Sequence, residues 1–226
     1  MGKKYRVGTR KSPLALKQVE EVLCGLKKFY PSIKIEIVGI DPYGDKDKVT
    51  PISDIEGTDF FTREIDDSLL KGEIDFSVHS AKDLPDNLRE GLAIAAITAP
   101  IDPYDVLVSK SGLVLDKLPS GTKVGTSSMR RKTQLREYRN DFEIVDIRGN
   151  IEERLYRLDN SDMDAIVTAA VGLVRLGLEN RITQRIPFEI LRPHPLQGAL
   201  AIIVREDDAY LRKILSVIDA REAVSK

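Results

Sequence analysis

The chain has 226 residues, of which 42% are hydrophobic and 31% charged, and its formal net charge is -1. This length suits one large globular domain or two modest ones, and the composition is that of an ordinary globular protein. The near-zero charge argues against general nucleic-acid binding, no apolar run approaches the ~20 residues of a membrane span, and a single cysteine excludes an internal disulfide.

The N-terminus, M-G-K-K-Y-R-V-G-T, leads directly into a strand-like segment without an apolar signal-peptide core. With one cysteine, this predicts a cytoplasmic protein. Ser12 and Pro13 then form an N-cap and first-turn pair that begins a helix. Cys24 falls in this helix, where we expect a small, partly buried side chain and not an activated thiol. The predicted apolar face of the helix consists of Leu16, Val19, Leu23 and Leu26.

Short segments rich in Ile and Val alternate with helical patterns along the rest of the chain. Asn150 with Glu153 three residues later resembles a capping box at the start of one helix. Strands separated by helices predict an α/β fold with mostly parallel pairing. Helical spacing is seen at Ile65 and Leu69, and at Ile151, Leu155 and Leu158. The predicted strands are 34–40, 74–80, 92–97, 142–147, 164–170 and 199–204.

Proline pairs mark two candidate crossovers between lobes, one at Pro100 and Pro103 and one at Pro193 and Pro195. A short internal sequence similarity also favours two lobes. Both Y-R-V-G-T-R-K-S-P and T-K-V-G-T-S-S-M-R-R have the pattern of a strand, a turn and a helix. The shared identity is short, so chance similarity is an open alternative to duplication. Both segments would place cations and free N–H groups at the carboxyl end of a strand, where α/β folds bind ligands.

Arginines recur at the predicted strand–helix junctions. Any single one could be a solvated surface charge. Arg130 and Arg131 are harder to explain in this way, because two cations in the first turn oppose the partial positive charge of a helix N-terminus. Their placement predicts a polyanionic ligand and leaves carboxylate and phosphate equally open. The full set is Arg10, Arg130, Arg131, Arg148, Arg154 and Arg175.

A polar cluster follows the second predicted strand in V-H-S-A-K-D-L-P, residues 78–85. Asp83 could act as a general acid or base, or stabilise a developing cation. Alternatively, it could hydrogen-bond its own turn before Pro85. His79 is more typical of a satisfied structural residue than of a catalyst. Two histidines are too few for a His-rich site, and we expect no metal.

Six ordered motifs together resemble the porphobilinogen deaminase (hydroxymethylbilane synthase) family, from about residue 5 to about residue 220. They are G-T-R-K-S-P-L-A-L, V-H-S-A-K-D-L-P, V-G-T-S-S-M-R-R, I-R-G-N-I-E-E-R-L, A-A-V-G-L-V-R-L-G and P-L-Q-G-A-L. The resemblance implies a transferase of tetrapyrrole and heme biosynthesis. Such an enzyme condenses four porphobilinogen units into hydroxymethylbilane and releases ammonia.

The resemblance also implies a fold and a site. The fold would have two lobes of periplasmic-binding-protein-like (type II) architecture, with a double crossover and a central cleft. We expect lobe 1 at 1–98 plus 195–218, lobe 2 at 99–194, and a stub at 219–226. Asp83 would be catalytic, hydrogen-bonding pyrrole nitrogens and assisting loss of the amine. Substrate and the dipyrromethane cofactor would be bound by Arg10, Ser12, Lys82, Thr126, Ser127, Ser128, Arg130, Arg131, Arg148, Arg154, Arg175, Gln197 and Gly198.

The sequence departs from the family in several respects, including Leu196 where a Gly is usual before Gln197 and Ile203 where a Glu is usual in the following strand. It stops where the family's third domain, which carries the cofactor-anchoring cysteine, would begin, so we expect no covalent anchor in this chain. Thr58 and Asp59 stand where the family often has Lys-Gly.

Because of these departures, three functional hypotheses stay open. The first is an enzyme whose third domain comes from a separate polypeptide, and the second is a minimal enzyme with a non-covalent primer. The third is a non-catalytic pyrrole- or polycarboxylate-binding protein on the same fold. A phosphate-binding transferase is a distant fourth. The expected partner is porphobilinogen, with no nucleic acid and no membrane.

Overall fold

The computed structural model describes residues 3–46 and 58–221. Within this part, the chain forms two compact units, the first made of residues 3–46, 58–101 and 198–221 and the second of residues 102–197. The chain therefore leaves the first unit after Ile101 and returns to it at Gly198. No helix in the described ranges is both long enough and apolar enough to span a membrane.

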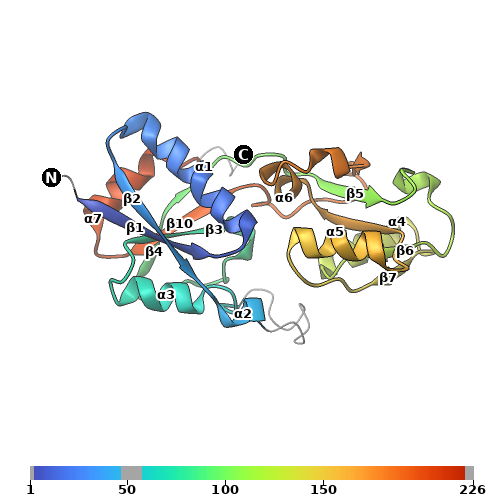
Figure 1. Ribbon diagram of the computed structural model, residues 1–226, viewed down its shortest axis with the longest axis horizontal. Coiled ribbons are helices and arrows are strands. Elements are labelled where there is room, and N and C mark those ends of the chain that lie inside the picture. Colours follow the sequence, from blue (N-terminus) through green and yellow to red (C-terminus); the bar gives the residue numbers. More distant parts are fainter. Residues whose placement is uncertain (1–2, 47–57, 222–226) are drawn as a thin grey trace. The chain divides into compact units, whose positions relative to one another are not determined.

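Unit 1 is a five-stranded mixed sheet with helices on both faces (Figure 1). Its strand order is β2-β1-β3-β10-β4, with β1 parallel to β2 and β3, and β10 antiparallel to β3 and β4. The strands are β1 (Lys4–Arg10), β2 (Lys34–Ile40), β3 (Phe76–Ser80), β4 (Leu92–Ile97) and β10 (Leu200–Arg205). The helices are α1 (Pro13–Phe29), α2 (Tyr43–Lys46), α3 (Arg63–Leu70) and α7 (Ala209–Leu215), with short 3-10 turns η2 (Ala81–Asp83) and η5 (Ser216–Ile218).

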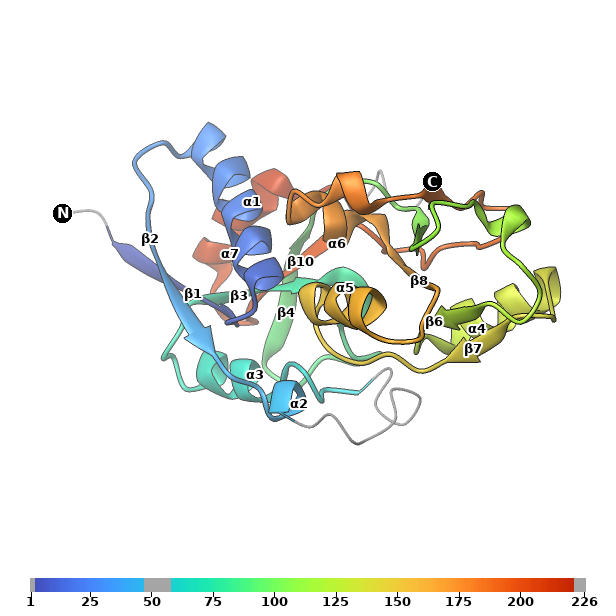
Figure 2. The ribbon, with the colours of Figure 1, turned by 45° about the vertical axis from the view of Figure 1, so that its right-hand side comes forward.

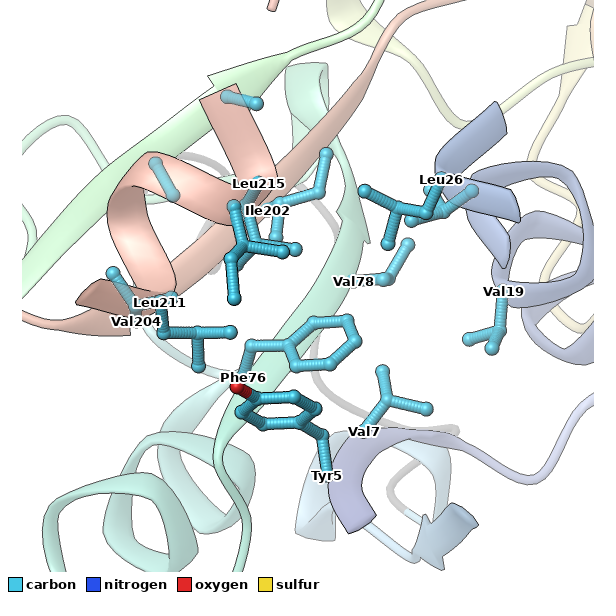
Figure 3. Packing of buried hydrophobic residues seen from close by; sticks show 14 of the residues in the cluster. Tyr5, Val7, Val19, Leu26, Phe76, Val78, Ile202, Val204, Leu211 and Leu215 are labelled. Carbon is cyan, nitrogen blue, oxygen red and sulfur yellow. The ribbon is translucent and has the colours of Figure 1, made fainter. Parts of the chain in front are cut away.

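The main core of unit 1 lies between the sheet and helices α1 and α7. Figure 3 shows Phe76 of β3 and Tyr5 of β1 at its centre, with Leu211 of α7 on one side and Val19 of α1 on the other. The opposite face of the sheet carries α3, which Figure 2 shows from another direction. The buried residues of α3 include Ile65. Burying each large aliphatic side chain contributes roughly 1.5–3 kcal/mol, so these two helix layers hold the sheet in place.

Helix starts follow the local sequence signals. Ser12 is the N-cap of α1, its side chain accepts from the N–H of Ala15 at 3.3 Å, and Pro13 occupies the first turn. The capping box at Asn150 and Glu153 is also present and begins α5 (Ile151–Asn160). Both capping predictions are confirmed. The face predicted for α1 is partly wrong, because Leu16 is exposed and the buried stripe runs through Ala15, Gln18, Val19, Val22 and Leu26.

Unit 2 repeats the plan of unit 1. Its sheet has the order β7-β6-β8-β5-β9, with β6 parallel to β7 and β8, and β5 antiparallel to β8 and β9. The strands are β5 (Asp105–Ser109), β6 (Lys123–Gly125), β7 (Glu143–Val145), β8 (Ala165–Ala169) and β9 (Gln184–Arg185). Besides α5, the helices are α4 (Met129–Tyr138) and α6 (Ala170–Arg175), with 3-10 turns η3 (Leu115–Lys117) and η4 (Glu179–Arg181).

Two clusters of buried side chains cover the two faces of the second sheet. Leu135 of α4 belongs to one cluster, while Leu158 of α5 and Leu173 of α6 belong to the other. Unit 2 is therefore also a sheet between two helix layers. An α/β fold is confirmed, but the prediction of mostly parallel pairing is wrong. Each sheet contains an antiparallel strand that a chain crossing between units supplies, β5 on entry and β10 on return.

The two V-G-T segments occupy equivalent places in the two units. Gly8 in β1 and Gly125 in β6 both lie against a bulky neighbour from the same unit. A Cβ would lie closer than 3.0 Å to Ile74 Cδ1 in the first case and to Met163 Sδ in the second, so a larger residue would force these side chains to shift. The matching strand order and the matching close contacts give the sequence similarity a structural basis.

Candidate functional site

The unit 1 group of predicted site residues gathers at one edge of the sheet. Arg10 ends β1, and Lys82 and Asp83 lie in η2 directly after β3. Because β1 and β3 are parallel, their carboxyl ends meet at this edge. Gly198 approaches the same edge from the antiparallel side, since Ala81 N–H donates to Ala199 O at 3.0 Å. Arg10 packs its guanidinium 5.1 Å from the ring centroid of Phe61.

Asp83 is exposed and Lys82 is partly exposed, so both are accessible to a ligand within this unit. Ser12 lies at the start of α1, where free N–H groups and the helix dipole favour an anion. The adjacent Thr9 hydroxyl is buried and has no hydrogen-bond partner within the described ranges. This edge therefore combines two cations, an acid and a helix N-terminus.

His79 is a buried neutral residue behind this edge. Its Nε2 lies 2.9 Å from Ser77 Oγ, and burial together with the nearby Arg10 charge lowers its pKa to about 4, against a smaller opposing effect of Asp83. A histidine with this pKa carries no charge near neutral pH. The structural interpretation of His79 therefore fits better than a catalytic one.

We expect His79 and the buried Asp66 to have opposite effects on how stability depends on pH. Burial raises the pKa of Asp66 to about 6, so folding loses stability as pH rises from about 4 to 6. The lowered pKa of His79 has the reverse sign, and stability is lost as pH falls from about 6.5 to 4. Each shift corresponds to roughly 3 kcal/mol at most, so the two effects largely cancel in the wild type. Urea unfolding at pH 4.5, 6 and 7.5 should show Asp66→Asn stabilising the protein at pH 7.5 but not at pH 4.5.

Two further variants control this experiment. Asp67→Asn, in the same helix but half-exposed and paired with Arg89, should leave the difference between the two pH values unchanged. His79→Gln should make the protein lose stability more steeply from pH 4.5 to 6 than the wild type does. An Asp66→Asn protein no more stable than wild type at pH 7.5 would show that the carboxyl is not held in the buried state described.

The unit 2 group gathers at the corresponding edge of the second sheet. Thr126, Ser127 and Ser128 follow β6, and Arg148 follows β7. Ser127 ties these two loops together, because its hydroxyl donates to Ile147 O at 2.8 Å and accepts from Ile147 N–H at 2.9 Å. Its proton is thus committed within the chain, and a ligand could use only its remaining lone pair. The Thr126 hydroxyl, like that of Thr9, is buried without a partner in the described part of the chain.

Arg154 and Arg175 lie on the helices that follow β7 and β8. Arg154 Nε donates to Gly149 O at 2.8 Å, which holds the side chain across the start of α5. Arg175 is the last residue of α6. Both are partly exposed, as is Arg148. All three can therefore present guanidinium donors at the surface of unit 2.

Arg130 and Arg131 occupy the first turn of α4, but their counter-charge comes from within the chain. Arg131 Nε and Nη2 donate to Asp105 Oδ1 at 3.0 and 2.7 Å, and Arg130 Nη2 donates to Asp105 Oδ2 at 2.7 Å. Asp105 and Arg131 are both buried. The helix-dipole conflict therefore does not by itself require an external anion, which corrects the argument made from sequence. The assignment of both arginines to ligand binding stays a prediction.

Gln197 joins the same cluster from the returning crossover. Its Nε2 donates to Asp105 Oδ1 at 2.9 Å and to Pro103 O at 2.7 Å, and its side chain is fully buried. Asp105 was not among the residues predicted from the sequence. Its strand, D-V-L-V-S, is short and follows Pro103, and no local pattern distinguishes its acid from any other strand-end aspartate.

Cys24 is exposed on α1, so the prediction of a partly buried side chain is wrong. It lies twelve positions beyond the Ser12 cap, about 18 Å along the helix axis at 1.5 Å per residue. This position does not fit an anchor for a cofactor held beside Ser12. In the described ranges, no group of three His, Cys, Asp or Glu side chains is arranged to hold a metal ion.

Known proteins resemble this chain closely in sequence. The family described as "Porphobilinogen deaminase, dipyromethane cofactor binding domain" matches residues 5–213. A porphobilinogen deaminase from Natranaerobius thermophilus is 46% identical over 97% of this chain and 71% of its own length. The porphobilinogen deaminase of Pelotomaculum thermopropionicum is 44% identical over 99% of this chain and 72% of its own.

The chain belongs to the porphobilinogen deaminase family. The matching family domain is the one that binds the dipyrromethane cofactor, which agrees with an edge lined by arginine and hydroxyl side chains. The relatives are longer, and this chain spans about 71% of their length.

Solved structures share the fold at low sequence identity. The methionine-binding protein MetQ aligns with a TM-score of 0.56 and 16% identity, over 95% of this chain and 89% of its own. The probable amino-acid ABC transporter extracellular-binding protein ytmK from Bacillus subtilis aligns with a TM-score of 0.55 and 13% identity, over 100% of this chain and 93% of its own. The chain therefore has the type II periplasmic-binding-protein-like fold.

Proposed function

We propose that this chain carries out the porphobilinogen deaminase reaction, joining four porphobilinogen units into hydroxymethylbilane and releasing one ammonia per unit. The observation that carries the proposal is the family match over residues 5–213. The exposed Asp83 and the arginine-rich edges supply the chemistry that this reaction needs. No observation on the described residues favours the non-catalytic alternative.

The reaction needs recognition of carboxylates and stabilisation of a cation. Each pyrrole carries an acetate and a propionate, which match the planar donor fork of arginine. When the C–N bond of the aminomethyl group breaks, the electron pair leaves with nitrogen and positive charge develops on the pyrrole. A carboxylate placed at that charge lowers the barrier. We assign this role to Asp83 and carboxylate binding to Arg10, Ser12, Lys82 and the unit 2 group.

The dipyrromethane cofactor fits the same donors. When bound, it supplies the primer to which the pyrrole units are joined. In unit 2, Arg148, Arg154 and Ser128 are partly exposed and can bind its acid side chains. The Thr126 hydroxyl, which has no partner among the described residues, can accept or donate a further hydrogen bond. In unit 1, Lys82 is the corresponding cation. A separate polypeptide that contributes to the enzyme stays a prediction, as does the cytoplasmic location.

The test is consumption of porphobilinogen by the purified 226-residue chain, with intact mass recorded before and after. Turnover with an unchanged mass would support the activity and a primer held without a covalent bond. Turnover with a stable adduct would support the activity and direct attention to Cys24. If there is no turnover, the C-terminal third of a longer relative should be added. Failure of that mixture as well would contradict the proposal.

A further inference from the structure

Asp105 is a fully buried carboxylate that the family assignment leaves without a role. It begins β5 and accepts hydrogen bonds from three side chains, those of Arg130, Arg131 and Gln197. Burial alone would raise its pKa, but the charges and hydrogen bonds of Arg131 and Arg130 outweigh burial and hold the pKa below its usual value. Asp105 is therefore ionised at neutral pH, and the cluster of two arginines and one aspartate has a net charge of +1.

The two guanidinium groups can lie side by side because the carboxylate of Asp105 accepts hydrogen bonds from both and balances part of their charge. They follow each other in the first turn of α4, and this first turn contains no acidic side chain. Without Asp105, mutual repulsion would drive the two cations apart, and the helix dipole would disfavour both of them at the helix N-terminus. Arg131 is bound through two of its nitrogens, which fixes the plane of its guanidinium group. Arg130 is bound to Asp105 and also to the carbonyl of Arg192.

Unit 1 shows that the fold itself does not require an acid at this place. Asp105 is the first residue of β5 and pairs with Ala169, the last residue of β8. The equivalent residue of unit 1 is Leu200, which begins β10, pairs with Ser80 at the end of β3, and is fully buried. The matching helix α1 begins with Pro-Leu-Ala and has no arginine in its first turn. The buried acid is therefore associated with the two arginines and is not a requirement of the sheet itself.

We propose that Asp105 is a positioning residue for the reaction. It orients Arg130 and Arg131 so that their remaining N–H donors meet the carboxylates of the pyrrole substrate. Its hydrogen bond from Gln197 fixes this arrangement to the returning crossover. The inference rests on the proposed function. Among the contacts within the described ranges, Nη1 of Arg131 and Nε of Arg130 keep donors that Asp105 does not engage.

The experiment compares Asp105→Asn with a matched control in the same unit. Asp102→Asn removes a carboxylate that pairs with Arg185 and touches neither Arg130 nor Arg131. We expect Asp105→Asn to weaken porphobilinogen binding by about 10- to 100-fold, mostly as a rise in KM, because a misplaced binding group can cost up to about 100-fold. Asp102→Asn should change binding less than about 2-fold.

A second readout does not depend on activity. Peptide-resolved modification by phenylglyoxal measures how firmly each arginine is held. We expect Arg131 to react faster in Asp105→Asn than in wild type, and at an unchanged rate in Asp102→Asn. A folded Asp105→Asn protein with wild-type affinity and wild-type arginine reactivity would overturn the inference. A wild type that neither binds nor consumes porphobilinogen would instead refute the proposed function, while the reactivity measurement would still test whether Asp105 holds the arginines.

The double variant Asp105→Asn with Arg131→Gln covers the case in which Asp105→Asn alone does not fold, since it removes one cation together with the anion. If Asp105 acts through the two arginines, adding Asp105→Asn to a protein that already carries Arg130→Gln and Arg131→Gln should weaken porphobilinogen binding by less than about 2-fold. A further loss of 10-fold or more on that background, in a folded protein, would show that Asp105 acts by another route.

Discussion

Replacing Asp83 by asparagine is expected to lower porphobilinogen turnover by at least about 100-fold while leaving the fold intact. Asp83 is exposed in η2, so the substitution removes the carboxylate that we assign to the cationic pyrrole and disturbs little packing. Surface substitutions of this kind change stability by roughly 0.5 kcal/mol or less, so the melting temperature should move by no more than about 2 °C. Steady-state turnover and a thermal melt measure the two quantities.

The control for this prediction is Asp86→Asn. Asp86 is exposed in the same loop, three residues beyond Asp83, and should be replaceable without loss of turnover. If Asp83→Asn turned over porphobilinogen at the wild-type rate, Asp83 would return to the turn-forming interpretation before Pro85. Intact mass must confirm that the asparagine has not deamidated, since that reaction restores aspartate.

Replacing Arg131 by alanine should damage both stability and function. The substitution removes two hydrogen bonds to the buried Asp105 and leaves its charge only partly compensated by Arg130 and Gln197. Breaking a buried ion pair in this way costs about 3–5 kcal/mol, and the remaining partners should keep the loss near about 3 kcal/mol. Losing a charged hydrogen bond to substrate should also weaken binding by about 10- to 100-fold. Urea unfolding and equilibrium binding of porphobilinogen check the two effects.

Arg185→Ala is the matched comparison for stability. Arg185 also pairs with an aspartate of unit 2, Asp102, but its side chain is 47% exposed. Its loss should cost less than about 1 kcal/mol, as for other surface ion pairs. An Arg131→Ala protein as stable as Arg185→Ala would mean that Asp105 does not depend on Arg131, and unchanged pyrrole binding would remove Arg131 from the site.

Local sequence signals predicted much of the fold because their physical causes lie within a few residues. Ser12 with Pro13, and Asn150 with Glu153, satisfy the free N–H groups of their own helix, so their geometry follows from neighbouring residues. Strands 34–40 and 92–97 were predicted with their observed bounds, since short runs that contain several Ile or Val residues favour extended structure. The shared V-G-T segments suggested two similar units, and the two sheets do have the same plan of strand order.

Local sequence signals did not predict the direction in which each strand runs in its sheet. In each sheet, the antiparallel strand is donated by a crossing between units, and nothing in D-V-L-V-S or L-A-I-I-V-R indicates which neighbour it will pair with. Alternation of strands and helices therefore overestimated parallel pairing. The prediction failed where connectivity, and not propensity, decides the arrangement.

The family, the helix starts and the places where arginines gather could be predicted from sequence, because each rests on neighbouring residues or on ordered motifs. The group that balances the charges of Arg130 and Arg131 could not, because it comes from a distant part of the chain. Asp105 lies 25 and 26 positions from them and 92 positions from Gln197. These groups meet because β5 is inserted antiparallel beside β8, which brings its first residue to the edge where α4 begins. A buried charge must find its partner through the packing of distant segments, and local sequence does not encode that contact.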